Sequence, residues 1–167
     1  MDFFDCISSR RSVRAYDSRP VEDEKLRKVL EAGRTAPTAH DFQPFRIVVV
    51  PTAGRSEELG RIYKQPWFST APLVILVCAL PGAAWSRRDG KNYADVDAAI
   101  VMDHMILAAR ALGLGSCWIG AFDPAAAKDI LKLDPGWEPI AFTPLGYPKE
   151  SPEARPRKSS DELVIYK

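Results

Sequence analysis

Residues 95–114 limit most strongly how this chain can fold. They have the pattern of one long helix, and its apolar residues lie on almost every face: Val96, Ala99, Ile100, Ile106, Ala109 and Leu112 are among them. Such a helix belongs at the centre of a fold or across a subunit interface, because only there is each apolar face covered. Asp95 or Asp97 is expected to cap its start, and the glycines of 113–115 to end it.

Apolar, β-branched runs bounded by proline or glycine predict four strands, at residues 46–50, 72–80, 116–120 and 138–148. Helical patterns cover residues 2–9, 20–37, 56–64 and 123–133. The mixed order of elements, without a repeat or a linker, predicts one α+β domain over residues 1–167, built around a small sheet. The polar tail ends in ELVIY (162–166), which could add a strand at a sheet edge. The tail has too few apolar residues to fold on itself, so we expect it to pack on another surface, such as a partner subunit.

Charge and cysteine content narrow the class of protein. The 23 basic and 22 acidic side chains leave a net charge of +1, so no overall charge favours nucleic acid or an anionic membrane. Three scattered cysteines without a CxxC pair fit reduced thiols rather than a disulfide framework or a zinc site, and no metal site is expected. The amino terminus has no secretory hydrophobic region, and the longest apolar run, 71–80, is too short to cross a bilayer. A cytoplasmic location is expected.

Two compact basic groups stand out on this neutral chain. Arg10, Ser12 and Arg14 lie near the amino terminus, and Arg155 and Arg157, followed by Lys158, lie near the carboxyl terminus. Arginine offers paired, planar donors that suit phosphate oxygens. Either group alone reads more readily as a solvated surface segment, whereas the two together favour one shared anion.

The loop APTAHDFQPF (36–45) contains Thr38 and Gln43, which could hydrogen-bond a polar heterocycle, although loops often carry such residues. The chain has no GxGxxG after a strand and no GxxxxGK[ST], so neither common phosphate-binding loop is supported. No serine, histidine and aspartate arrangement has local support either. His40 and His104 are the only histidines, and His104 is interpreted as a buried structural residue.

In order, these segments resemble the nitroreductase family of flavin-dependent oxidoreductases. The matching segments are RRSVR (10–14), APTAHDFQPFRIVVV (36–50), AARALGLGSCWIG (108–120), PLGYP (144–148) and RPRKSSDELVIYK (155–167). The resemblance covers nearly the whole chain. It implies a central, mostly antiparallel sheet flanked by helices, and a carboxyl-terminal arm packed on the partner of a homodimer.

The resemblance also implies two FMN molecules at the subunit interface. By similarity, Arg10, Arg11, Ser12 and Arg14 hold the phosphate, ribityl chain and flavin edge, and Arg155 and Arg157 complete the phosphate site. Thr38, Ala39 and Gln43 would come from the other subunit, and Trp118, Ile119 and Gly120 would border the ring. Arg14 would stabilise the electron-rich edge of the reduced flavin. Asp41 replaces the asparagine usual in the family, so that contact is not carried over.

The expected activity is transfer of hydride from NAD(P)H, with reduction of nitroaromatic, quinone or similar small acceptors in a ping-pong order; in such enzymes the flavin carries the chemistry. The alternatives are another flavin reaction of the same fold, such as dehydrogenation or dehalogenation, or a flavin-binding module with little turnover. The chain is short for the family, and the reduction lies between the second strand and the central helix. The polar loop 85–93 in this region is interpreted either as a solvated lid or as the determinant of acceptor specificity. Its candidate residues are Trp85, Arg87, Arg88, Lys91 and Tyr93.

Overall fold

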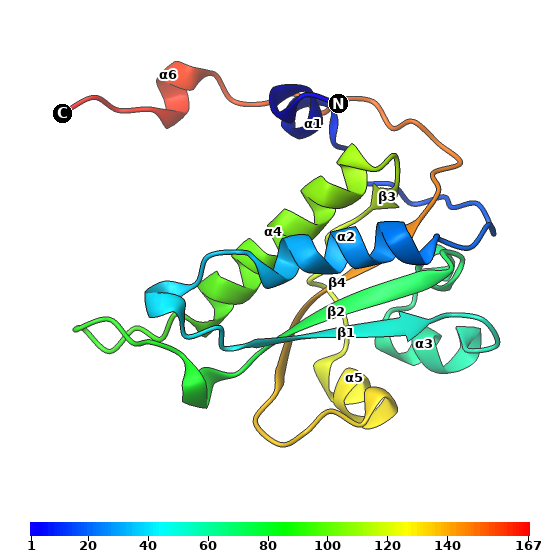
Figure 1. Ribbon diagram of the computed structural model, residues 1–167, viewed down its shortest axis with the longest axis horizontal. Helices are drawn as coiled ribbons and strands as arrows, with labels where there is room; N and C mark the ends of the chain where they lie inside the picture. Colours follow the sequence, from blue (N-terminus) through cyan, green and yellow to red (C-terminus); the bar gives the residue numbers. More distant parts are fainter.

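Strand β2 (Leu73–Ala79) lies at the centre of a four-stranded sheet. In the computed structural model, which describes residues 1–167, it pairs antiparallel with β1 (Phe45–Pro51) and with β4 (Glu138–Gly146). The short strand β3 (Gly115–Ser116) pairs antiparallel with β4, so the sheet order is β1-β2-β4-β3 (Figure 1). The predicted antiparallel α+β architecture is confirmed.

Helices cover both faces of this sheet. The helices α2 (Asp23–Arg34) and α4 (Ala94–Ala111) lie on one face, and α3 (Ser56–Ile62) and α5 (Pro124–Leu131) lie on the other (Figure 1). Side chains of β2 alternate between the two layers, so Ile75 and Val77 join the core under α2 and α4. Leu76 faces the opposite core, against Phe142 of β4. Both faces of β2 are therefore covered, which explains its uninterrupted apolar sequence.

Helix α4 has the central position that its apolar pattern predicts. It contacts α2, α1 and all four strands. Its amino-terminal end lies near the 3₁₀ helix η1 (Ala39–Asp41), and its carboxyl-terminal end lies near α1 (Phe3–Ser9) (Figure 1). Two further 3₁₀ helices, η2 (Pro66–Ser69) and η3 (Pro81–Ala83), flank β2. None of the helices combines the length and the apolar character that crossing a membrane requires.

The structure corrects two predicted strands. Of the 116–120 run only Ser116 lies in a strand, because the Cys117 N–H donates to the Thr143 hydroxyl (3.1 Å) instead of to a backbone carbonyl. Pairing resumes only as a bridge between Ile119 and Phe142. The ELVIY segment is not a strand in this chain, since its first two residues belong to α6 (Ser160–Leu163), which a capping box between Ser159 and Glu162 starts.

The predicted cap of the central helix is also wrong. The helix begins at Ala94, and the Ala94 N–H donates to the side-chain oxygen of Asn92 (2.9 Å). Asp95 is exposed, and Asp97 is buried with a different hydrogen-bond partner. His104 is half-buried rather than buried.

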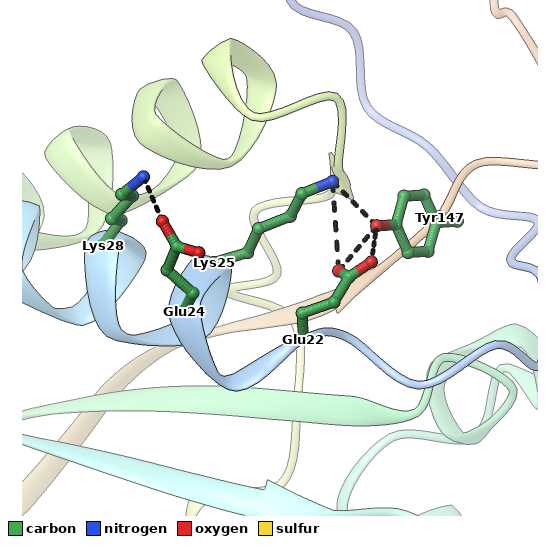
Figure 2. A network of polar contacts seen from close by, with 5 residues as sticks. All are labelled: Glu22, Glu24, Lys25, Lys28 and Tyr147. Carbon is green, nitrogen blue, oxygen red and sulfur yellow. Dashed lines mark hydrogen bonds and ion pairs between the residues drawn. The ribbon is translucent and has the colours of Figure 1, made fainter.

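A polar cluster fastens the segment between α1 and α2 to the end of β4 (Figure 2). The Tyr147 hydroxyl lies 2.6 and 2.7 Å from the two Glu22 carboxylate oxygens, and Lys25 Nζ donates to it at 2.7 Å. The hydrogen bond from Tyr147 lowers the pKa of Glu22, and the contact with Tyr147 raises the pKa of Lys25. The Asp17 N–H donates to the Tyr147 carbonyl (2.8 Å), so the chain leaving the first basic group is fixed beside β4.

Candidate functional site

The two basic groups at opposite ends of the chain meet in one pocket of about 830 Å³. It is lined by Ile7, Ser8, Arg10, Arg11, Ser12, Arg14, Pro152, Glu153, Ala154, Arg155, Pro156 and Arg157. The extended carboxyl-terminal segment passes α1 on its way to α6, which brings the second group beside the first (Figure 1). The two groups that are compact in the sequence therefore lie side by side in the structure.

The first basic group is positioned by the end of α1 and by strand-like pairing. Helix α1 ends where the Arg10 N–H donates to the Cys6 carbonyl (3.0 Å). The following chain pairs with β3, with the Val13 N–H 2.9 Å from the Ser116 carbonyl. Val13 is buried, so alternation turns the side chains of Ser12 and Arg14 the other way, toward the pocket.

The electrostatics of the pocket favour an anion. Five arginines line it against one glutamate. Arg11 is engaged locally, because its guanidinium donates to the carbonyls of Ser8 (2.7 Å) and Arg10 (2.8 Å). The side chains of the other four form no ion pair within the chain: Arg10, Arg14, Arg155 and Arg157. Free guanidinium groups around one cavity suit the several oxygens of a phosphate.

Arg14 lines the pocket as an exposed residue. Its guanidinium carbon is 5.8 Å from the centre of the Trp67 ring, and its backbone N–H donates to a carboxylate oxygen of Glu150. The buried thiol of Cys117 is nearby, and burial raises its pKa although the Arg14 charge opposes the shift. A cation at this position would favour negative charge on any ligand that reached it.

The segment 118–120 follows the strand that pairs with the first basic group. Trp118 is 38% exposed, Gly120 is exposed, and Ile119 is buried at its bridge with Phe142. These residues do not line the pocket, although β3 connects them to Ser12 and Val13. Within this segment the backbone N–H and carbonyl of Ile119 are both bonded to Phe142, so only Trp118 and Gly120 are exposed beside the basic group.

The loop with Thr38, Ala39 and Gln43 lies elsewhere in the chain. It contacts the start of α4 through Asp97, whereas α1 contacts the end of α4, where the Arg110 guanidinium donates to the Ser9 hydroxyl (3.1 Å). Asp97 and Arg110 are thirteen residues apart, which is about 20 Å along a helix axis. One chain therefore does not bring this loop to the arginine pocket.

The loop 85–93 is a short hairpin beside the 38–43 loop. A bridge joins Ser86 to Asn92, and Trp85 meets Tyr93 edge to face at 5.0 Å. Arg87 pairs with Asp89 (2.6 Å) and donates to the Tyr93 hydroxyl (3.2 Å). The two remaining candidates are exposed and form no ion pair: Arg88 and Lys91.

The sequence reasoning missed two residues that join these loops. The His40 ring stacks on Trp85 at 5.2 Å, and Asp97 accepts a hydrogen bond from the Ala39 N–H at 2.9 Å. The sequence feature that marks Asp97 is a carboxylate within an otherwise apolar stretch, and this feature also fits a helix cap. Asp41, the departure from the family pattern, accepts a hydrogen bond from the Gln43 side-chain amide (3.0 Å) and so occupies that amide within the loop.

Comparison with known proteins relates nearly the whole chain to one protein family. The sequence model of the Nitroreductase family matches residues 7–64 and 57–147. A nitroreductase family protein from Clostridium difficile 630 is 38% identical, and the match covers 99% of this chain and 98% of the other with a TM-score of 0.88. A Desulfovibrio desulfuricans protein solved in complex with FMN is 28% identical, with 100% and 98% coverage and a TM-score of 0.87. The NADH dehydrogenase of Thermus thermophilus is 29% identical over 95% of this chain and 92% of its own length.

Proposed function

The chain belongs to the nitroreductase family, and we propose that it is an FMN-dependent oxidoreductase that takes hydride from NAD(P)H and reduces a small acceptor. The observation that carries this proposal is the pocket in which arginines from both ends of the chain meet around one cavity. Its donor set suits a phosphate monoester, which is the anionic group of FMN. Bound FMN would supply the ability to accept a hydride and to pass its electrons on.

The pocket residues divide the cofactor between them in this proposal. Arg10, Arg155 and Arg157 hold the phosphate, and the Ser12 hydroxyl adds a neutral donor. Arg14 lines the same pocket and stabilises negative charge on the flavin edge, which favours transfer of two electrons together. Trp118 and Gly120, the exposed residues of the 118–120 segment, border the ring. The protein binds and orients the cofactor and tunes its charge. No pocket residue is a histidine or cysteine that would act as a general base or nucleophile.

The proposed site needs two subunits. The loop carrying Thr38, Ala39 and Gln43 contacts α4 about 20 Å from where α1 does, so a second copy must supply it if both regions hold one flavin. This separation supports a homodimer with a flavin at each of two equivalent interfaces. In a dimer with two-fold symmetry every contact between the subunits occurs twice, so there are two equivalent sites.

The carboxyl-terminal arm supports the same arrangement. Val164, Ile165 and Tyr166 are 49%, 76% and 94% exposed, so the arm covers little apolar surface within its own chain. A groove of about 750 Å³ runs between α2 and the unpaired edge of β1, with apolar walls from Leu30, Ile47 and Val49. We assign this groove to the arm of the partner subunit, because an exposed apolar segment and an exposed edge strand bury each other's surface.

The acceptor is proposed to be a nitroaromatic, a quinone or a similar planar compound. It would bind near the hairpin, where Trp85 and Tyr93 offer ring faces and Arg88 and Lys91 offer unpaired charges. NAD(P)H and acceptor would occupy the same place in turn, which gives ping-pong kinetics. One binding position beside the flavin is enough for both substrates, because hydride transfer requires no side-chain acid at a second position.

The test is reconstitution of the purified protein with FMN, followed by anaerobic addition of NADH and NADPH in separate samples. We expect the flavin absorption to bleach with at least one nicotinamide and to return when a quinone or nitroaromatic is added. Protein that does not bind FMN would refute the cofactor assignment. Protein that binds FMN but bleaches with neither nicotinamide would refute the oxidoreductase and leave a binding module.

A further inference from the structure

Asp97 is a buried carboxylate with no role in the site as described so far. It is 1% exposed, and its Oδ1 accepts a hydrogen bond from the Ala39 N–H at 2.9 Å. Its Oδ2 is buried without a hydrogen-bond partner. Burying a carboxylate with half of its acceptors unused is unfavourable, so this position needs a reason other than stability.

The loop that Asp97 holds is strained. His40, Asp41 and Gln43 have φ angles of 53°, 56° and 52°, in the left-handed region that residues other than glycine rarely adopt. Each such residue is less stable in this conformation than in the right-handed or extended one, because its Cβ crowds the backbone carbonyl oxygen. Three of them within four positions persist only where the surroundings fix the loop.

Few contacts are available to fix it. Within the loop, the Gln43 N–H donates to the Thr38 hydroxyl (3.0 Å). The bond from Ala39 to Asp97 is the one hydrogen bond that joins residues 38–43 to a distant part of the chain. The other anchor is the stacking of His40 on Trp85. Both anchors belong to the junction of the hairpin with α4, where the Asp97 N–H donates to the Tyr93 carbonyl (2.9 Å).

We propose that Asp97 is a positioning residue, which holds the Thr38–Gln43 loop in the conformation in which it meets the flavin of the partner subunit. The inference rests on the proposed FMN site. Asp97 does not line the cofactor pocket, and it acts through the Ala39 backbone. If the loop relaxes when this bond is lost, only the fraction of molecules with the loop in place binds flavin tightly, and the apparent Kd rises by the inverse of that fraction.

The test compares Asp97→Ala with Asp97→Asn in FMN and riboflavin titrations. The asparagine keeps an oxygen acceptor for Ala39, although a neutral one. The expected order of affinity is wild type, then Asp97→Asn, then Asp97→Ala, with the alanine variant about 10- to 100-fold weaker, as for loss of a hydrogen bond to a charged group. FMN and riboflavin should lose the same factor, because the loop lies away from the phosphate-binding arginines. Hydrogen exchange of the Ala39 amide in the FMN-free protein should quicken in Asp97→Ala and stay slow in Asp97→Asn.

Asp103→Ala is the matched control, because Asp103 lies exposed on the same helix without a hydrogen bond and its loss should change neither readout. Flavin affinity of Asp97→Ala equal to wild type would overturn the proposal, as would an Asp97→Asn variant that is as weak as Asp97→Ala. If Asp97→Ala does not fold, Ala39→Pro removes the donor instead, and the extended Thr38 (φ −130°, ψ 158°) suits a residue before proline. Wild-type affinity in Ala39→Pro would equally refute it. Wild-type protein that binds no FMN refutes the proposed function, whereas the exchange of the Ala39 amide still reports on Asp97.

Discussion

Arg10→Ala tests whether the arginine pocket holds a phosphate. The half-buried Arg10 guanidinium has no partner in the chain, so its whole hydrogen-bonding capacity is available to a ligand. A hydrogen bond between charged groups contributes about 1.5–3 kcal/mol, which corresponds to a Kd for FMN about 10- to 150-fold higher in the variant. Arg155→Ala should lose less, about fivefold or below, because Arg155 is exposed and an exposed charge pair is worth about 1 kcal/mol at most.

The assay is a fluorescence titration with FMN and, in parallel, with riboflavin, which is the same flavin without the phosphate. Both arginine variants should weaken FMN and leave riboflavin unchanged. Arg61→Ala removes the same charge from an exposed position on α3, outside the pocket, and serves as the control for net charge. Equal losses for FMN and riboflavin, or no loss for FMN in Arg10→Ala, would refute the assignment of these arginines to a phosphate.

Three further predictions concern the fold. Gly146→Ala should destabilise the protein by about 1–3 kcal/mol in urea unfolding, because an added Cβ would lie 2.7 Å from Cδ of Pro72; an unchanged midpoint would show that the two segments can move apart. Tyr147→Phe should lower stability at neutral pH. Its hydrogen bond lowers the pKa of Glu22, so this contribution is present above the ordinary pKa of about 4.3 and is lost as the pH falls through the lower folded value. Urea midpoints of variant and wild type should therefore converge in acid, and a constant difference would contradict the argument. Burial raises the pKa of Cys78 to about 12, so a thiol reagent at pH 8 should label Cys78 only after unfolding, as mass spectrometry of the labelled peptide would show.

The sequence predicts the layers of the fold better than its small elements. The long apolar runs of β2 and α4 can be buried in few ways, which is why the central helix and the sheet are read correctly from pattern alone. The run at 116–120 also contains apolar residues, but a single side chain, the Thr143 hydroxyl, accepts from the Cys117 N–H and the strand ends there. Such a contact between distant residues leaves no periodic trace in the sequence.

The site shows the same division. The two arginine groups could be recognised because each is compact in sequence and unusual on a neutral chain. Asp97 could not, since its partner Ala39 is 58 residues away and is a backbone amide, which no residue type marks. The strained conformation of His40 and Asp41 is hidden for a similar reason, because tertiary contacts impose it on residues without a strong local preference.

The distance that α4 sets between α1 and the 38–43 loop predicts how two defective variants behave in a mixed dimer. In the proposed dimer, each flavin would meet the arginines of one subunit and the loop of the other. A mixed dimer of an Arg10→Ala subunit with an Asp97→Ala subunit would then carry both defects at one interface and neither at the second. When the two weakly binding variants are unfolded and refolded together, one site of every mixed dimer should regain tight flavin binding. Such complementation would show that each flavin contacts residues of both subunits.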